Sequence, residues 1–111
     1  MAKLATYWQR GEAIDYKNET AAVIPANTLL IVGSVLGVAG MDIPVGEVGS
    51  LHVEGVFEIP KKASTAVTAG AKITYTDTDG ASPASGSNPV YGYAVEAAAA
   101  EAATVLVKLL G

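Results

Sequence analysis

The sequence of 111 residues contains no cysteine, and it has a single histidine, a single phenylalanine and a single tryptophan. The absence of cysteine excludes disulfides, thiolate catalysis and cysteine-based metal sites. Charged residues make up only 16% of the chain and aromatic residues 6%, so the core must be built from Val, Leu and Ile, thinned by small residues. Because so little charge leaves little polar surface to keep a free monomer in solution, we expect an oligomer or a docked partner.

Two further absences bear on partners. The net charge of −4 provides no basic stripe to neutralise phosphates, so nucleic acid is not an expected partner. No stretch approaches the roughly 18 apolar residues of a membrane span, and the N-terminus lacks the apolar region of a signal peptide. The expectation is a soluble chain that folds as one domain, without a membrane partner.

The clearest pattern in the sequence is the alternation of residues 51–60, LHVEGVFEIP. An extended strand places alternate side chains on opposite faces, so one face carries Leu51, Val53, Gly55, Phe57 and Ile59. The other face carries His52, Glu54, Val56 and Glu58. The pattern predicts one half-buried strand that Pro60 closes, with its second face in solvent.

Other segments also favour strands. Residues 28–36 are continuously apolar, as in a strand covered on both faces. Residues 73–76 and 90–96 alternate, residues 104–110 close the chain as a strand, and residues 81–89 have the composition of a surface loop. The predicted core residues are Leu51, Val53, Phe57, Ile59, Tyr75, Val105 and Val107.

A weakly repeated sequence pattern indicates where turns lie. Residues 24–27, 43–46 and 67–70 each place a β-branched residue three positions before Gly or Asn, with an apolar run soon after, which indicates turns that lead into strands. Residues 61–69 favour a helical turn or a short helix, and residues 97–103 a hairpin connection with one helical turn. The predicted fold is all-β: a small single-domain β-barrel or barrel-like sandwich with at most one or two short helical turns.

Residues 1–20 are polar and aromatic, and this composition predicts an arm or an edge strand attached to a body of residues 21–111. It contains Tyr7, Trp8 and Arg10, the residue types most enriched at interface hot spots. We therefore expect these three residues to contact a shell or a neighbouring subunit. The alternative is a first strand whose Trp8 packs on its own domain.

Candidate chemical sites are few. His52, Glu54 and Glu58 share one strand face and suit a metal, although a solvated face has the same pattern. Residues 77–80, DTDG, resemble half a calcium loop, but a turn is the simpler interpretation. Residues 18–20 form a glycosylation sequon that has no meaning without secretion. No phosphate-binding motif and no carboxylate pair in a buried setting is present, so neither an enzyme nor a cofactor is expected.

Several stretches of the sequence are similar to the small decoration, or cement, proteins of tailed-bacteriophage capsids. The similarity is most specific in residues 55–61, GVFEIPK, in Ala69-Gly70 leading to Tyr75, and in residues 105–109, VLVKL. Thr76 stands where many relatives carry an aromatic residue, and the closing loop is unusually rich in Ala.

The resemblance implies an all-β, barrel-like protein that assembles, commonly as a trimer, on the outside of a mature icosahedral shell and has no catalytic residues. Its expected partners are the major capsid protein and further copies of itself, and its expected location is the capsid exterior after synthesis in the host cytoplasm. Two alternatives stay open. One is a barrel that binds a small ligand in a cavity beside Gly55, Gly92 and Ala94, and the other is an enzyme of unrecognised type.

Overall fold

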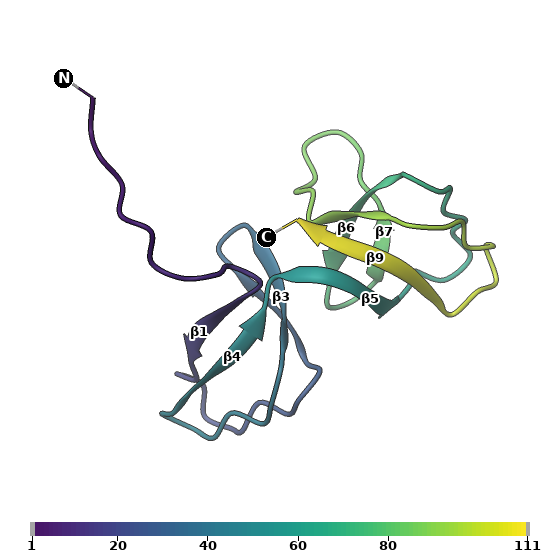
Figure 1. Cartoon of the computed structure of the whole chain (residues 1–111). Helices are drawn as coiled ribbons and strands as arrows, with labels where there is room; N and C mark the ends of the chain where they lie inside the picture. Colours follow the sequence, from purple (N-terminus) through teal and green to yellow (C-terminus); the bar gives the residue numbers. More distant parts are fainter. Residues whose placement is uncertain (1, 111) are drawn as a thin grey trace.

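A computed structural model describes residues 2–110, which form two antiparallel β-sheets joined end to end (Figure 1). The first sheet has the strand order β1-β4-β3-β2 and the second β5-β9-β8-β6-β7. The strands of the first sheet are β1 (Ala13–Lys17), β2 (Leu29–Val32), β3 (Val35–Ala39) and β4 (Val48–His52). Those of the second are β5 (Glu54–Pro60), β6 (Lys72–Thr76), β7 (Gly80–Pro83), β8 (Gly92–Ala94) and β9 (Thr104–Leu110). The prediction of an all-β, barrel-like or sandwich-like fold is confirmed.

The two sheets repeat one topology. Replacing β1, β4, β3 and β2 by β5, β9, β8 and β6 converts the first strand order into the second, with β7 added at the edge. A shift of 43 residues carries Ala13 onto Val56, and these residues pair with His52 and Lys108 respectively. We call residues 12–53 the N-terminal repeat and residues 54–110 the C-terminal repeat.

The turns that lead into β2 and β6 repeat as well. Asn27 and Gly70 both adopt a left-handed backbone, with φ of 71° and 82°. Their amides donate to equivalent carbonyls, Ala39 at 2.7 Å and Ala94 at 2.8 Å. Two of the three similar segments noted in the sequence, residues 24–27 and 67–70, therefore contain the same turn, in which Asn or Gly is needed because φ is positive. The third, residues 43–46, is a separate turn in which Gly46 has φ of 80°.

The two repeats also share an isolated β-bridge just before the turn that they have in common. Ile24 pairs with Ile43 in the N-terminal repeat, and Val67 pairs with Ala98 in the C-terminal repeat. Both bridges exchange two backbone hydrogen bonds of 2.8 to 3.0 Å. The β-branched residue that opens each motif is thus fixed by a partner far away in the chain.

The repeats differ at one hairpin. Gly33 and Ser34 alone connect β2 to β3, and Gly33 has φ of 61°, as a two-residue turn requires. The equivalent connection in the C-terminal repeat, from β6 to β8, spans residues 77–91 and contains β7. β7 lies beside β6 and also forms a parallel bridge from Ala81 to Lys61, so it wraps that sheet toward a barrel.

The main core belongs mostly to the C-terminal repeat. Ile59, Ile73, Val107 and Leu109 are at its centre, and Leu36 and Val38 of β3 join it from the N-terminal repeat. The N-terminal repeat has a small cluster of its own, which consists of Ile24, Ala39 and Ile43 with Tyr16 and Leu30 against them. Burial of Leu36 and Val38 in the main core attaches the two repeats to each other.

The continuous strand predicted for residues 28–36 is wrong. The segment is the β2–β3 hairpin, and its outer strand exposes Ile31 and Val32. Gly33-Ser34 lies inside the apolar run and forms a two-residue hairpin turn, so the run is divided into two strands although its apolar character is continuous. The loop predicted for residues 81–89 is also shorter than expected, because its first residues belong to β7.

Residues 51–60 form two strands rather than one. β4 ends at His52 and β5 begins at Glu54, so the segment crosses from one sheet to the other at Val53. Gly55, at φ of 122°, lies just beyond the crossing. Because the alternation is interrupted there, the rings of His52 and Phe57 come together instead of lying on opposite faces.

The two predicted helical turns are absent, since residues 2–110 contain no helix. Residues 61–69 contain a turn at Ala63-Ser64, and residues 97–103 contain a turn at Ala100-Glu101. The alanine-rich segment is the β8–β9 connection, as expected, but the bridge from Ala98 to Val67 overrides its helix propensity.

Candidate interaction surface

The N-terminal arm, residues 2–11, leaves the body at β1 and contains no strand (Figure 1). Its large side chains are almost fully in solvent: Leu4 is 96% exposed, Trp8 87% and Tyr7 81%. Such apolar groups are normally buried or covered by a partner. The arm is therefore the strongest candidate for a binding element in the described chain.

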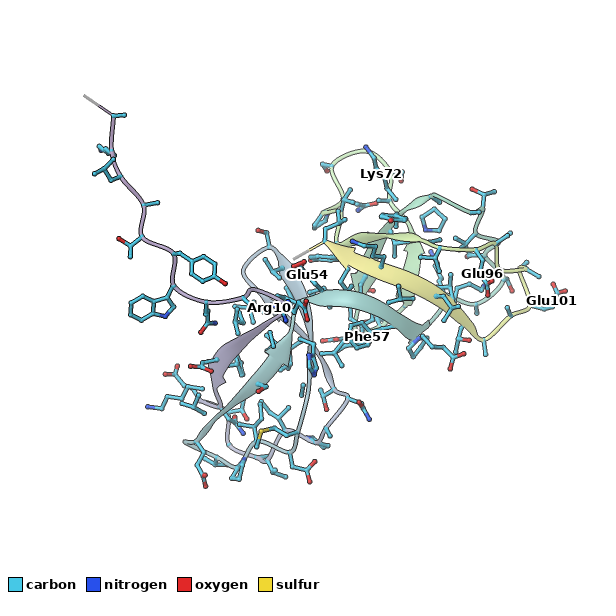
Figure 2. The ribbon with its side chains drawn as sticks, in the orientation of Figure 1. Arg10, Glu54, Phe57, Lys72, Glu96 and Glu101 are labelled. Atoms are coloured by element: carbon cyan, nitrogen blue, oxygen red, sulfur yellow. The ribbon has the colours of Figure 1, made fainter. Side chains whose placement is uncertain are left out.

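The predicted contact residues are carried by this arm, but they do not form a compact patch. Tyr7 and Trp8 are neighbours in a segment without secondary structure, and their side chains would leave on opposite sides if the arm paired as a strand. Arg10 is also exposed, and Figure 2 places it at the base of the arm, near the start of β5. A partner strand would thus meet Leu4, Thr6 and Trp8 on one side, and Tyr7 on the other.

The predicted core residues fall into two groups. Leu51, Val53, Ile59, Val105 and Val107 are buried. Phe57 and Tyr75 are half-buried and pack against the main core from its edge. Burial and the nearby carboxylate of Asp77 raise the pKa of Tyr75 above its ordinary value of 10.0.

The suggested metal face is not assembled. His52 lies at the end of β4, whereas Glu54 and Glu58 belong to β5 on the other side of the crossing. No group of three or more potential metal ligands occurs among residues 2–110. The DTDG segment is the three-residue turn of the β6–β7 hairpin, with Gly80 at φ of 81°.

The small residues considered for a ligand cavity serve close packing. A Cβ atom on Gly92 would lie 2.2 Å from the Lys108 carbonyl oxygen, which shows that β8 approaches β9 too closely for any side chain there. Ala94 is fully buried, and Gly55 is an exposed residue near the sheet crossing. These positions therefore provide backbone contact and conformational freedom, not room for a ligand.

Sequence reasoning missed two buried polar residues. Asn18 is fully buried: its side-chain nitrogen donates to the carbonyls of Ala22 and Ile43, and its oxygen accepts from Thr20. It is a structural side chain, inaccessible to a glycan. Lys61 is 7% exposed, and its Nζ donates to the carbonyls of Lys62, Thr65 and Ala100. The Asn-x-Thr spacing is also typical of a local turn closed by a side-chain hydrogen bond, and this signal could have identified Asn18 as a structural residue.

An all-β body with an arm that exposes Leu4, Tyr7 and Trp8 is compatible with a structural protein that works by contact with other proteins. The family model for phage cement proteins matches residues 8–109, so this chain belongs to the phage cement protein family. The membership gives it a structural role at a phage capsid, and the match begins at Trp8 within the arm. Neither the curated proteins nor the solved structures gave a match to this chain. Residues 2–110 include no helix able to cross a membrane.

Proposed function

We propose that this protein binds the outer surface of a mature capsid through its N-terminal arm, stabilises the shell, and does so as a homotrimer made in the host cytoplasm. The observation that carries the proposal is the arm, where Leu4, Tyr7 and Trp8 are at least 81% exposed with no part of their own body against them. Its proposed partner is the major capsid protein.

The physical basis is mass action. A protein that binds the assembled shell but not its free subunits raises the free energy of disassembly. Each site needs only modest affinity, because the contacts of one oligomer act together. A folded body with a protruding arm suits this role, since ten residues span up to about 30 Å when extended, which is long enough for the arm to contact a neighbouring subunit.

Deletion of residues 2–10 tests the role of the arm. We expect the truncated chain to keep the melting temperature of the body, and to bind undecorated capsids at least about tenfold more weakly, which corresponds to 1.4 kcal/mol. The double variant Tyr7→Ser, Trp8→Ser should reproduce most of this loss. The matched control is Val23→Ser, an apolar residue 53% exposed on the body.

A truncated chain that binds normally would show that the arm is incidental. A truncated chain that fails to fold would place Trp8 in the fold of the body. Shell stabilisation is measured separately, as the difference in melting temperature between decorated and undecorated capsids, and the oligomer is measured by sedimentation of the free protein.

A further inference from the structure

The sheet of the N-terminal repeat has an open edge at β2. β2 is the last strand in the order β1-β4-β3-β2, and within residues 2–110 the strand makes backbone hydrogen bonds to β3 alone. Ile31 is 44% exposed and Val32 36%. The edge therefore presents unpaired peptide groups beside apolar side chains, a surface on which another strand readily pairs.

The other edges of the molecule carry features that discourage pairing. β1 has Asp15 and Lys17 on its exposed side, and β7 ends in Pro83. β5, the remaining edge strand, carries Glu54 and Glu58 and ends in Pro60. β2 has the sequence LLIV, without a charge, a proline or a bulge. Charges and proline are the usual protection of an edge strand, so β2 is the unprotected edge of this fold.

The C-terminal repeat shows what fits beside such an edge. There β7 pairs antiparallel with β6, placing Ala81 opposite Tyr75 and burying it completely. The shift of 43 residues carries Val32 of β2 onto Tyr75 of β6. The two-residue turn after Val32 leaves the N-terminal repeat without an equivalent of β7, although the strand that β7 would cover is present.

The N-terminal arm has the properties of the missing strand. It belongs to no strand and exposes Leu4, Tyr7 and Trp8. Its only charged side chains before Glu12 are Lys3 and Arg10. Residues 12–53 carry five acidic side chains and one lysine, a net charge of −4 against +2 for the arm. Opposite charges favour docking of the arm on this repeat.

A second copy suits the geometry better than the same chain as the source of the arm. The arm of the same chain starts at β1, on the opposite edge of the sheet from β2, and would have to turn back across β4 and β3 to reach it. Figure 1 shows that it leads away from β1 and from the rest of the body. The low charge of the whole chain also favours self-association.

We infer that the arm of one copy adds as an antiparallel strand to the β2 edge of a second copy, in the place that β7 takes beside β6. This inference names the contact for the self-association in the proposed function, and it does not require a capsid. Each copy then donates one arm and receives one.

Single-cysteine variants provide the direct test, because the natural chain has no cysteine. Ile31→Cys protein is mixed under oxidising conditions with variants that carry one cysteine at Leu4, Ala5 or Thr6. A disulfide needs Cβ atoms about 4 Å apart, so we expect a cross-linked dimer whose yield peaks at one arm position and falls at its neighbours. The matched control is Val45→Cys, 54% exposed in the turn before β4. Equal yields with this control would overturn the inference, as would cross-linking only within a diluted double-cysteine chain.

Ile31→Pro tests the edge without altering the arm. In a hairpin with a two-residue turn, the Val32–Val35 pair is hydrogen-bonded, so the peptide groups of Ile31 face the open edge. We expect this variant and the deletion of residues 2–10 each to weaken self-association at least about tenfold in sedimentation. Unchanged association of a folded Ile31→Pro protein would overturn the inference.

The outcomes separate this contact from capsid binding. An arm that cross-links only when capsids are present would refute the contact between copies and leave capsid binding intact. Cross-linking between copies, with normal capsid binding after deletion of the arm, would support this contact and refute the role of the arm at the shell.

Discussion

The rings of His52 and Phe57 lie 6.3 Å apart between centroids and are inclined by 39°. His52 ends β4 and Phe57 lies in β5, so the pair spans the crossing between the two repeats. Gly40 leaves space for the His52 ring, since a Cβ atom at residue 40 would lie 2.6 Å from His52 Nε2. The junction of the repeats is therefore closed by an aromatic contact beside the backbone link at Val53.

Substitution of this pair should destabilise the junction. Because Phe57 is half-buried, we expect Phe57→Ala to lower the free energy of unfolding by about 2–3 kcal/mol, less than a fully buried Phe. His52→Ala should cost about 1 kcal/mol, and the double variant should show coupling of roughly 0.5–1.5 kcal/mol, as for other aromatic pairs. Urea unfolding measures all three, with Val56→Ala as the exposed control. Strict additivity would mean that the contact contributes nothing.

Asn18→Ala should cost about 1–3 kcal/mol, because it removes the hydrogen bonds that the buried amide donates to the carbonyls of Ala22 and Ile43 and those that it accepts from Thr20. The control is Asn88→Ala, an exposed loop residue that accepts a single hydrogen bond from Ser85, for which we expect less than about 0.5 kcal/mol. Thermal or urea unfolding compares the two. Similar losses in both variants would contradict a special role for Asn18.

Lys61→Met should cost about 1–3 kcal/mol for the same reason, since three carbonyl oxygens lose the ammonium group that they share. Lys62→Met is a matched control at the next position, where the side chain is exposed. A Lys61→Met protein as stable as the control would show that apolar packing replaces the hydrogen bonds without loss.

Stability at alkaline pH should depend on Tyr75. Its raised pKa means that the folded chain holds the phenolic proton more tightly than the unfolded chain, whose value is near 10.0. This contribution is fully present below the unfolded pKa and is lost as pH rises through the higher folded pKa. Tyr75→Phe should therefore lose stability less steeply above pH 10.0 than the natural chain. Parallel curves of unfolding free energy against pH would refute the effect.

The sequence predicted the fold class and most buried strand positions, because alternation is a local signal. Ile59 and Val107 are buried within alternating strands, as period two requires. It did not predict where one strand ends and another begins. Val53 continues the alternation of its neighbours, and only contacts far away in the chain make it the point where the sheet changes.

The repeat was visible only as three similar turns. β2 and β6 occupy equivalent places, but their sequences are LLIV and KITY, so the equivalence lies in register and hydrogen bonds rather than in residue type. The roles of Asn18 and Lys61 were hidden for a related reason. The 43-residue shift carries Asn18 onto Lys61. Both side chains are buried and donate hydrogen bonds to backbone carbonyls, Asn18 through its amide and Lys61 through its ammonium group.

The unequal cores imply an order of folding. The C-terminal repeat buries a large cluster and takes Leu36 and Val38 from its neighbour, whereas the N-terminal repeat keeps three buried residues in a cluster of its own. We expect the C-terminal repeat to form first and to act as the template on which β3 docks. In native-state hydrogen exchange, the amides of β1 should then exchange through openings of lower free energy than those of β9. The N-terminal repeat, which carries the arm, is therefore expected to unfold locally before the C-terminal repeat.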